Sequence, residues 1–413
     1  MSGESTDSSK RQEHELMKIA PIHPFPARMA PEIAIAELGR LSPGSTVFDP
    51  MMGSGTVLRH AVEFGHRAVG FDMDPLAVLM SRVWSTRVSD QSIEAVSRAL
   101  FDVLPHMKSV ALPWIDDDEE TSDFVSFWFG GAQRRDLRRL AFAINKMGMD
   151  ASSAQRKAVD VLRIAMSRII ITKCAGASLA NDVSHSRPHK VMESSEFDVL
   201  AAFRRSLGQV RSRIDSIPKG ATVRTSLGDA RKLAGVRQAT ADLVLTSPPY
   251  LNAIDYMRGH KLSLVWLGHS ISALRDIRSS SIGAERKASE EITKVARGVQ
   301  CAMVDGDQLA ARHLAMVERY SLDLVNMMQQ TARVLKPEGR AILVVGNSCL
   351  KETFITNSVG VKRAASAAGL RFLKETIREL PTNSRYLPMP VESDSALGKR
   401  MRTESILTFK KIA

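Results

Sequence analysis

Short apolar runs with the pattern of β-strands alternate with helical stretches at both ends of the chain. Strands are predicted at 45–49 and 67–72, and the helical pattern at about 57–64 between them makes a β-α-β unit. Helices are also predicted at 75–84 and 314–335. Further strands are predicted at 222–226, 241–246, 340–345, 371–379 and 405–410. This alternation favours an α/β fold with a mainly parallel, doubly wound sheet.

The middle of the chain lacks the strand pattern. The clearest helix there has apolar residues at steps of three and four over 197–214, and a second helix covers about 154–171. The acidic run at 116–120 is interpreted as a solvated loop. We therefore interpret 85–217 as a helical insertion and the polar segment 251–311 as a second insertion. The main α/β domain then consists of 21–84 and 218–413, preceded by a disordered tail at 1–20.

Composition excludes several classes of protein. The chain has 413 residues, of which 44% are hydrophobic, and no apolar run approaches the length of a membrane span. The first 15 residues lack the apolar core of a signal peptide. Cys174, Cys301 and Cys349 are isolated and lack metal-ligand spacing. These features predict a cytoplasmic protein with no membrane association and no metal site.

The positive charge is concentrated in one region. The formal net charge is +12, and residues 131–240 contain 21 Lys and Arg against 9 Asp and Glu, an excess as large as that of the whole chain. A surface that faces phosphates would carry such charge, and Arg204, Arg205, Arg211 and Arg213 are candidates. A solvated helical face with no ligand is the alternative.

A glycine-rich turn follows the first predicted strand. In the run 48–56, Gly53 and Gly55 allow a sharp turn and a close approach to a ligand, and the next helix begins there with free N–H groups. Asp72 ends the second strand, where a carboxylate is placed to hold ribose hydroxyls, whereas Asp74 is equally suited to cap the next helix. Asp229 follows the third strand and could bind an adenine amino group or serve as a turn residue.

The second motif, Thr246-Ser-Pro-Pro-Tyr250, follows the fourth strand and so lies at the same sheet edge. An exocyclic base amine is a poor nucleophile because its lone pair is delocalised into the ring. Acceptors at Ser247 and the Pro248 carbonyl could take its N–H bonds and direct the lone pair at a methyl group. Tyr250 would stack on a base flipped from the duplex. A Pro-rich strand end with a packed Tyr is the structural alternative.

Together, these motifs resemble the S-adenosyl-L-methionine-dependent amino-methyltransferases that modify cytosine N4 or adenine N6 in DNA. Those enzymes carry Asp-Pro-Phe-x-Gly-Ser-Gly-Thr and Ser/Asp/Asn-Pro-Pro-Tyr/Phe motifs, and the Ser form is commoner among cytosine-N4 enzymes. The run 23–28, His-Pro-Phe-Pro-Ala-Arg, is similar to their cofactor-lining segment. The candidate cofactor-binding residues are Pro24, Phe25, Asp49, Pro50, Gly53, Ser54, Gly55, Thr56, Asp72 and Asp229, and the candidate catalytic residues are Ser247, Pro248, Pro249 and Tyr250.

The resemblance implies a Rossmann-like class I methyltransferase fold with a mostly parallel seven-stranded sheet and an antiparallel last hairpin. It also implies double-stranded DNA as the substrate, with a restriction enzyme or another defence-system protein as a candidate partner. In many such enzymes the cofactor motif follows the catalytic motif, whereas here it precedes it. For target recognition we consider the basic insertion and 251–311, including Arg258, His260 and Lys261; a lid or dimer surface is the alternative for the insertion.

Other functions remain as alternatives. Cytosine-C5 methylation requires a Cys nucleophile, usually after Pro, and none of the three cysteines follows a proline. Adenine-N6 methylation and methylation of an RNA base amine use similar motifs on the same fold. A catalytically dead nucleic-acid-binding subunit is a further alternative. A nicotinamide oxidoreductase would leave the Ser-Pro-Pro-Tyr motif unexplained. We predict methyl transfer to cytosine N4 in DNA.

Overall fold

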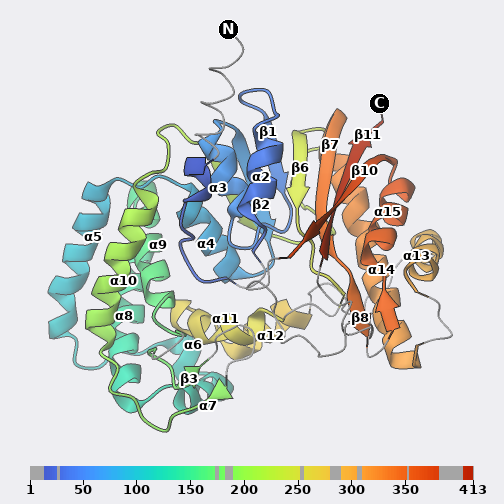
Figure 1. Ribbon diagram of the computed structural model, residues 1–413. Helices are drawn as coiled ribbons and strands as arrows, with labels where there is room; N and C mark the ends of the chain where they lie inside the picture. Colours follow the sequence, from blue (N-terminus) through green and yellow to red (C-terminus); the bar gives the residue numbers. More distant parts are fainter. Residues whose placement is uncertain are drawn as a thin grey trace.

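The predicted strands assemble into one seven-stranded sheet in the computed structural model (Figure 1). The structure describes residues 14–25, 28–172, 176–181, 189–251, 255–279, 290–304, 309–350, 353–380 and 403–412. The strands are β1 (Thr46–Asp49), β2 (Arg67–Asp72), β5 (Val223–Leu227), β6 (Ala241–Thr246), β7 (Leu335–Gly346), β10 (Leu370–Glu379) and β11 (Thr403–Lys411).

The order of the strands confirms the predicted fold class. Across the sheet they run β10-β11-β7-β6-β1-β2-β5. The pairs from β5 to β7 are parallel, whereas β11 lies antiparallel between β7 and β10. The fold is therefore α/β with a mostly parallel, doubly wound sheet whose last hairpin is antiparallel, as predicted. Because β1, β2, β5 and β6 are parallel, their carboxyl ends meet at one edge.

Alternate residues of the central strands enter two different cores. Val47 of β1 and Leu243 of β6 pack on one face with helices α2 (Pro31–Leu38) and α3 (Thr56–Glu63). Phe48 and Val244 point to the opposite face. That face is covered by α14 (Ala311–Val334) and α15 (Asn357–Ala367), and α13 (Glu290–Met303) packs on these two helices. Burial on both faces explains why the central positions of these strands are apolar.

A third core belongs to the helices between β2 and β5 together with those that directly follow β6. These helices lie beside and below the sheet in Figure 1. The members of this core come mainly from α4 (Pro75–Ser85), α5 (Asp90–Val103), α7 (Glu119–Trp128), α8 (Gly131–Met149), α9 (Ser153–Ser167), α10 (Val199–Ile214), α11 (Met257–Leu264), η2 (Val265–Leu267) and α12 (Ile271–Ser279). The first part of 251–311 therefore packs with the helices of 85–217, whereas α13 packs on α14 and α15. In Figure 1, α11 and α12 lie beyond the edge to which β6 points.

Some local predictions were wrong. The acidic run at 116–120 is helical rather than a loop: α6 (Pro113–Asp116) ends in it and α7 begins in it, with the Asp118 side chain accepting from the Thr121 N–H at 2.8 Å. An acidic first turn favours a helix start because it complements the helix dipole. The strand-free region 85–217 also contains a two-residue ladder of β3 (Ala180–Asn181) with β4 (His189–Lys190).

The remaining elements are short. They are η1 (Leu104–His106), β8 (Ser348–Leu350) and β9 (Thr353–Ile355). Of the predicted tail at 1–20, residues 1–13 lie outside the described residues, and Leu16 is buried. Among the described residues, no helix has the length and apolar character needed to cross a membrane. Nor does the described part of the chain contain three His, Cys, Asp or Glu side chains grouped as a metal site.

Candidate active site

The glycine-rich turn between β1 and α3 has a left-handed backbone conformation at two positions, which glycine adopts more readily than other residues. Gly53 and Gly55 have φ angles of +49° and +91°. A Cβ on Gly55 would lie 2.5 Å from Ser81 Oγ and 2.8 Å from Ser81 Cα. The turn is thus packed directly against the backbone of α4, and this contact determines where the N-terminus of α3 lies.

The start of α3 offers polar groups to an anionic ligand. Ser54 and Thr56 are buried, with exposed fractions of 4% and 3%. Thr56 Oγ1 has no hydrogen-bond partner among the described residues. Buried hydroxyls normally have a partner, and a helix N-terminus attracts a carboxylate. The residues present therefore fit the amino-acid end of S-adenosyl-L-methionine.

Asp72 is held at the end of β2 by two backbone N–H groups. Its Oδ2 accepts from Gly53 at 2.9 Å, and its Oδ1 accepts from Asp74 at 3.0 Å. Burial, reinforced by the charge of Asp74, raises the pKa of Asp72 to about 6. Each oxygen retains a lone pair, so the carboxylate can accept from the two hydroxyls of a ribose. Asp72 therefore fits its predicted role.

Asp74 is the N-cap of α4, which confirms the alternative raised from the sequence: its Oδ1 accepts from the Leu76 N–H at 2.8 Å. Its Oδ2 makes a short hydrogen bond to His260 Nδ1 of α11. Burial alone would raise the pKa of Asp74, but His260 and the helix N–H groups outweigh it and lower that pKa. This pair joins the first motif to the segment that follows the second motif.

Three aromatic rings form a wall beside the glycine turn. Phe25 stacks on Tyr256 with ring centroids 5.2 Å apart and lies 5.5 Å from the His260 ring. The Phe25 ring also covers Gly53, where a Cβ would lie 3.2 Å from it. Phe25 was predicted to line the cofactor pocket, whereas nothing in the sequence singled out Tyr256. Tyr256 and His260 reach this place because α11 packs against α4.

The second motif is anchored by hydrogen bonds at three points. Ser247 Oγ donates to the Val344 carbonyl at 3.0 Å, Tyr320 Oη donates to the Pro249 carbonyl at 3.1 Å, and Tyr250 Oη donates to Glu404 Oε1 at 3.2 Å. The Pro248 carbonyl accepts no hydrogen bond from the described residues. This motif therefore retains acceptors at Ser247 and Pro248.

The ring of Tyr250 packs against the backbone of β7. A Cβ on Gly346 would lie 2.7 Å from Tyr250 Cε2, so the glycine makes room for the ring. Burial, followed by the charge of Glu404, raises the pKa of Tyr250 well above its usual value. The phenol is therefore neutral and held in one orientation, as a stacking surface requires.

A buried hydrogen bond joins the two motifs. Thr246 Oγ1 donates to Asp49 Oδ1 at 2.7 Å, and the Met51 N–H donates to the same oxygen at 3.1 Å. β1 and β6 are parallel neighbours, with Phe48 paired to Val244. Pro50, the next residue, begins the glycine turn. Asp49 thus lies between the two motifs with an exposed fraction of 3%.

The charge of Asp49 makes stability depend on pH. Burial raises its pKa to about 7, whereas an unfolded Asp titrates near 4. The folded state therefore binds the extra proton, and we expect the free energy of unfolding to fall as pH rises from about 4 to about 7. Asp49→Asn keeps an acceptor for Thr246 and should reduce this slope in chemical denaturation at several pH values. Equal slopes in both proteins would contradict the assignment.

Asp229 is engaged in a buried ion-pair network. Its Oδ1 accepts from Arg231 Nε at 2.8 Å and its Oδ2 from Arg231 Nη2 at 2.9 Å, while Arg231 Nη1 donates to Asp323 at 2.9 Å. The Arg231 backbone N–H also donates to Asp229, which is the predicted turn arrangement. The adenine contact stays a prediction, and the ion pair gives this carboxylate a fixed direction.

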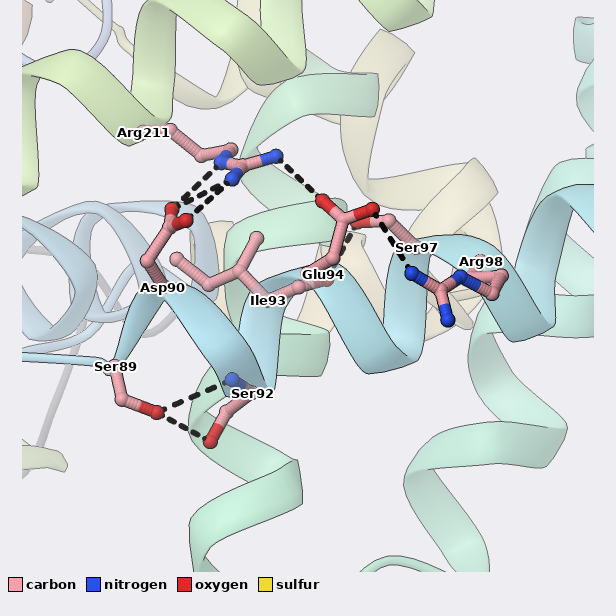
Figure 2. A network of polar contacts seen from close by, with 8 residues as sticks. All are labelled: Ser89, Asp90, Ser92, Ile93, Glu94, Ser97, Arg98 and Arg211. Carbon is pink, nitrogen blue, oxygen red and sulfur yellow. Dashed lines mark hydrogen bonds and ion pairs between the residues drawn. The ribbon is translucent and has the colours of Figure 1, made fainter.

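Several arginines of the predicted basic surface already have partners within the protein. Figure 2 shows Arg211 of α10 bound to two carboxylates of α5, with Nη2 2.7 Å from Asp90 Oδ1 and Nη1 3.0 Å from Glu94 Oε2. Arg213 donates to the Pro21 carbonyl at 2.8 Å, and Arg204 lies over the Phe101 ring at 4.5 Å. Arg211 therefore joins two helices, and its charge is neutralised by its neighbours.

Comparisons with known proteins identify distant relatives of the chain. M.MvaI, a type II methyltransferase of Kocuria varians, is 22% identical over 427 residues, which cover 94% of this chain and 90% of that protein. M.BsoBI, a type II methyltransferase of Geobacillus stearothermophilus, is 23% identical over 268 residues, which cover 60% of this chain and 52% of that protein. No protein-family model matches the chain.

A solved structure is similar over nearly the whole length. It is a TehB-like SAM-dependent methyltransferase from Corynebacterium glutamicum, 8% identical, with a TM-score of 0.30, and the match covers 98% of this chain and 97% of that chain. A TM-score this low carries no argument about the fold, which we assign from the strand order of the chain itself. In sequence, the chain is a distant relative of the type II methyltransferases.

Proposed function

We propose that the chain is a DNA methyltransferase that transfers a methyl group from S-adenosyl-L-methionine to the N4 amine of cytosine. The observation that carries this proposal is the state of Ser247. Its hydroxyl proton is used on the Val344 carbonyl, 3.0 Å away, so its oxygen presents only acceptor lone pairs. That is the chemistry needed to receive an N–H from a base amine. The distant similarity to type II methyltransferases supports DNA as the substrate.

The chain's residues have separate roles in this mechanism. Asp72 would hold the ribose and the N-terminus of α3 the carboxylate of the cofactor. When bound, the cofactor supplies an electrophilic methyl group on its sulfonium. Ser247 and the Pro248 carbonyl would accept the two N–H bonds of the amine, which directs its lone pair out of the ring plane. The N–methyl bond would form as the methyl–sulfur bond breaks and the thioether leaves, the amine would then lose one proton to solvent, and no covalent enzyme intermediate would form.

The two sites are brought together by adjacent strands. Asp49 at the end of β1 accepts from Thr246 at the end of β6, so the glycine turn and the Ser-Pro-Pro-Tyr segment start from neighbouring positions. A base inside a duplex cannot reach this edge, so we infer that it flips out and stacks on Tyr250. A restriction enzyme or another defence-system protein is the partner that this activity suggests.

The decisive experiment is methyl transfer from labelled S-adenosyl-L-methionine to unmethylated genomic DNA and, separately, to total RNA. Digestion to nucleosides and mass spectrometry then identify the product. N4-methylcytosine in DNA is the expected result, and N6-methyladenine would retain the mechanism but correct the base. Label confined to RNA would overturn the DNA assignment. Absence of label in both would favour a nucleic-acid-binding subunit, with Ser247→Ala protein as the background control.

A further inference from the structure

A cavity of about 410 Å³ lies between the end of α9 and α10, and it shares Pro24 with the predicted cofactor-lining segment. The residues that matter for its chemistry are Pro24, Arg168, Thr172, Arg205, Ser206 and Gln209. Two of them are arginines, and no carboxylate is among the residues that line it. The cavity therefore has the charge of an anion site.

Arg168 is a desolvated cation without a counter-charge in the described part of the chain. It makes no ion pair with any described residue, and its Nε is buried without a partner there. Its other nitrogens donate to the Ile22 carbonyl and, at 2.8 Å, to Gln209 Oε1. Burial and the nearby charge of Arg213 lower the pKa of Arg168 to about 10. A buried cation normally has an anionic partner, which a bound ligand would supply.

Thr172, which also lines the cavity, supplies a second polar atom without a partner among the described residues. Thr172 Oγ1 is buried and makes no hydrogen bond to any described residue. A hydroxyl beside a guanidinium is suited to an oxyanion, because the hydroxyl and the guanidinium N–H both donate. These two unsatisfied donors, which both follow the end of α9, point to a ligand with several acceptor oxygens.

The face of α10 that lines the cavity differs from its neighbouring face. Arg205, Gln209 and Arg213 are four residues apart and so lie on one side of the helix. Arg205 is exposed and makes no hydrogen bond or ion pair with the described residues. Arg211, on another side, is neutralised by Asp90 and Glu94 (Figure 2). Positive charge that is not neutralised is therefore directed toward the cavity.

The cavity adjoins the predicted cofactor-lining segment. Pro24 lines it, and the next residue, Phe25, belongs to the aromatic wall beside Gly53. His23 Nδ1 donates to the Pro24 carbonyl at 2.7 Å and its Nε2 bonds to Ser167 of α9 at 2.9 Å, which holds the segment on the helix. A polyanion at the candidate active site could thus reach the cavity.

We propose that this cavity binds a backbone phosphate of the nucleic-acid substrate, with Arg168 and Arg205 as the cations and Thr172 as a hydroxyl donor. The proposal rests on the proposed function, because it assigns the phosphate to DNA. It also separates the arginines of the basic region into a phosphate-binding set and a structural one, of which Arg211 is the clearest member. Base contacts are not involved, so the effect is independent of sequence.

The test uses three cavity variants: Arg168→Gln, Arg205→Gln and the double variant of these two. The matched control is Arg211→Gln, which lies on α10 like Arg205. Binding of a labelled mixed-sequence duplex is measured at several KCl concentrations. Loss of one neutralised phosphate should reduce the slope of log K against log salt by about 0.9. We expect this reduction in the double variant, a smaller one in each single variant, which keeps one arginine on the phosphate, and an unchanged slope in Arg211→Gln. Arg168→Lys should retain most of the slope because it keeps the charge.

Other outcomes would overturn the proposal. Arg205 is exposed, so its variant should fold even if loss of the Arg168 hydrogen bonds destabilises the protein, and melting temperatures report this directly. Unchanged slopes in every folded cavity variant would refute a phosphate contact. Stabilisation of the wild type alone by inorganic phosphate, with unchanged duplex slopes, would mean a free phosphate site instead of DNA. Because only binding is measured, this test is independent of whether methyl transfer occurs.

Discussion

Ser247→Ala is expected to lower the rate of methyl transfer to DNA by about 100-fold, the usual effect of removing one preorganised hydrogen-bonding group from a reacting centre. The alanine cannot accept the amine N–H, so the lone pair of the base stays delocalised in the ring. Cofactor affinity should be unchanged, because Ser247 bonds to Val344 of β7 and not to the glycine turn. Single-turnover rates and calorimetric titration with S-adenosyl-L-methionine measure the two quantities separately.

Two further variants make this prediction specific. Ser247→Asn restores an acceptor oxygen and should recover part of the rate, in keeping with the Asn form of the motif in similar enzymes. Tyr250→Phe removes the bond to Glu404 and the hydroxyl's interaction with Ser247 but keeps the stacking ring, so it should retain most of the activity, unlike Tyr250→Ala. A Ser247→Ala enzyme as fast as the wild type would refute the assigned role.

Gly55→Ala is expected to lower the free energy of unfolding by about 3 kcal/mol and to abolish measurable cofactor binding. Two causes add. The φ of +91° is unfavourable for any side chain, and the new methyl group would lie 2.8 Å from the Cα of Ser81, which cannot rotate away. Relief of that contact requires α3 and α4 to separate, which moves the N-terminus of α3. Denaturant titration and calorimetry would detect both effects.

Gly65→Ala is the matched control at the other end of α3. Gly65 has a similar φ of +72°, but a Cβ there would meet no atom of the described residues within 4 Å. Only the backbone cost remains, about 1 kcal/mol, and cofactor affinity should be preserved. If both substitutions had equal effects, the contact with Ser81 would carry no weight and the rigid placement of the turn would be unsupported.

The sequence alone was sufficient to predict the parallel sheet and the motifs at its carboxyl edge. Strands such as β2 and β6 are apolar at most positions, because both faces of a doubly wound sheet are buried, and such runs are recognisable without a structure. The carboxyl ends of parallel strands meet at one edge, so the glycine turn, Asp72 and the Ser-Pro-Pro-Tyr segment could be placed together from their positions along the chain. The mostly parallel sheet and its antiparallel last hairpin agree with that placement.

Local competition between helix and loop was harder to judge. The acidic run at 116–120 has the composition of a solvated segment, yet Asp118 caps α7. The packing of that helix decides the outcome: Val125 is buried in the helical core, and the Thr121 hydroxyl accepts from the Ile271 N–H of α12 at 2.8 Å. Such partners are 150 residues away in the sequence and leave no local pattern.

The number of charged residues can be counted from the sequence, but the sequence does not show which of them are free to bind a ligand. In the sequence, Arg205 and Arg211 are both arginines of one basic helix, and nothing local distinguishes them. Only the packing of α5 against α10 neutralises Arg211, while Arg205 meets no carboxylate among the described residues. The bonds of His260 to Asp74 and of Thr246 to Asp49 likewise join residues 186 and 197 positions apart. Backbone patterns are local and therefore encoded in the order of residues, whereas side-chain partnerships depend on distances that exist only once the chain has folded.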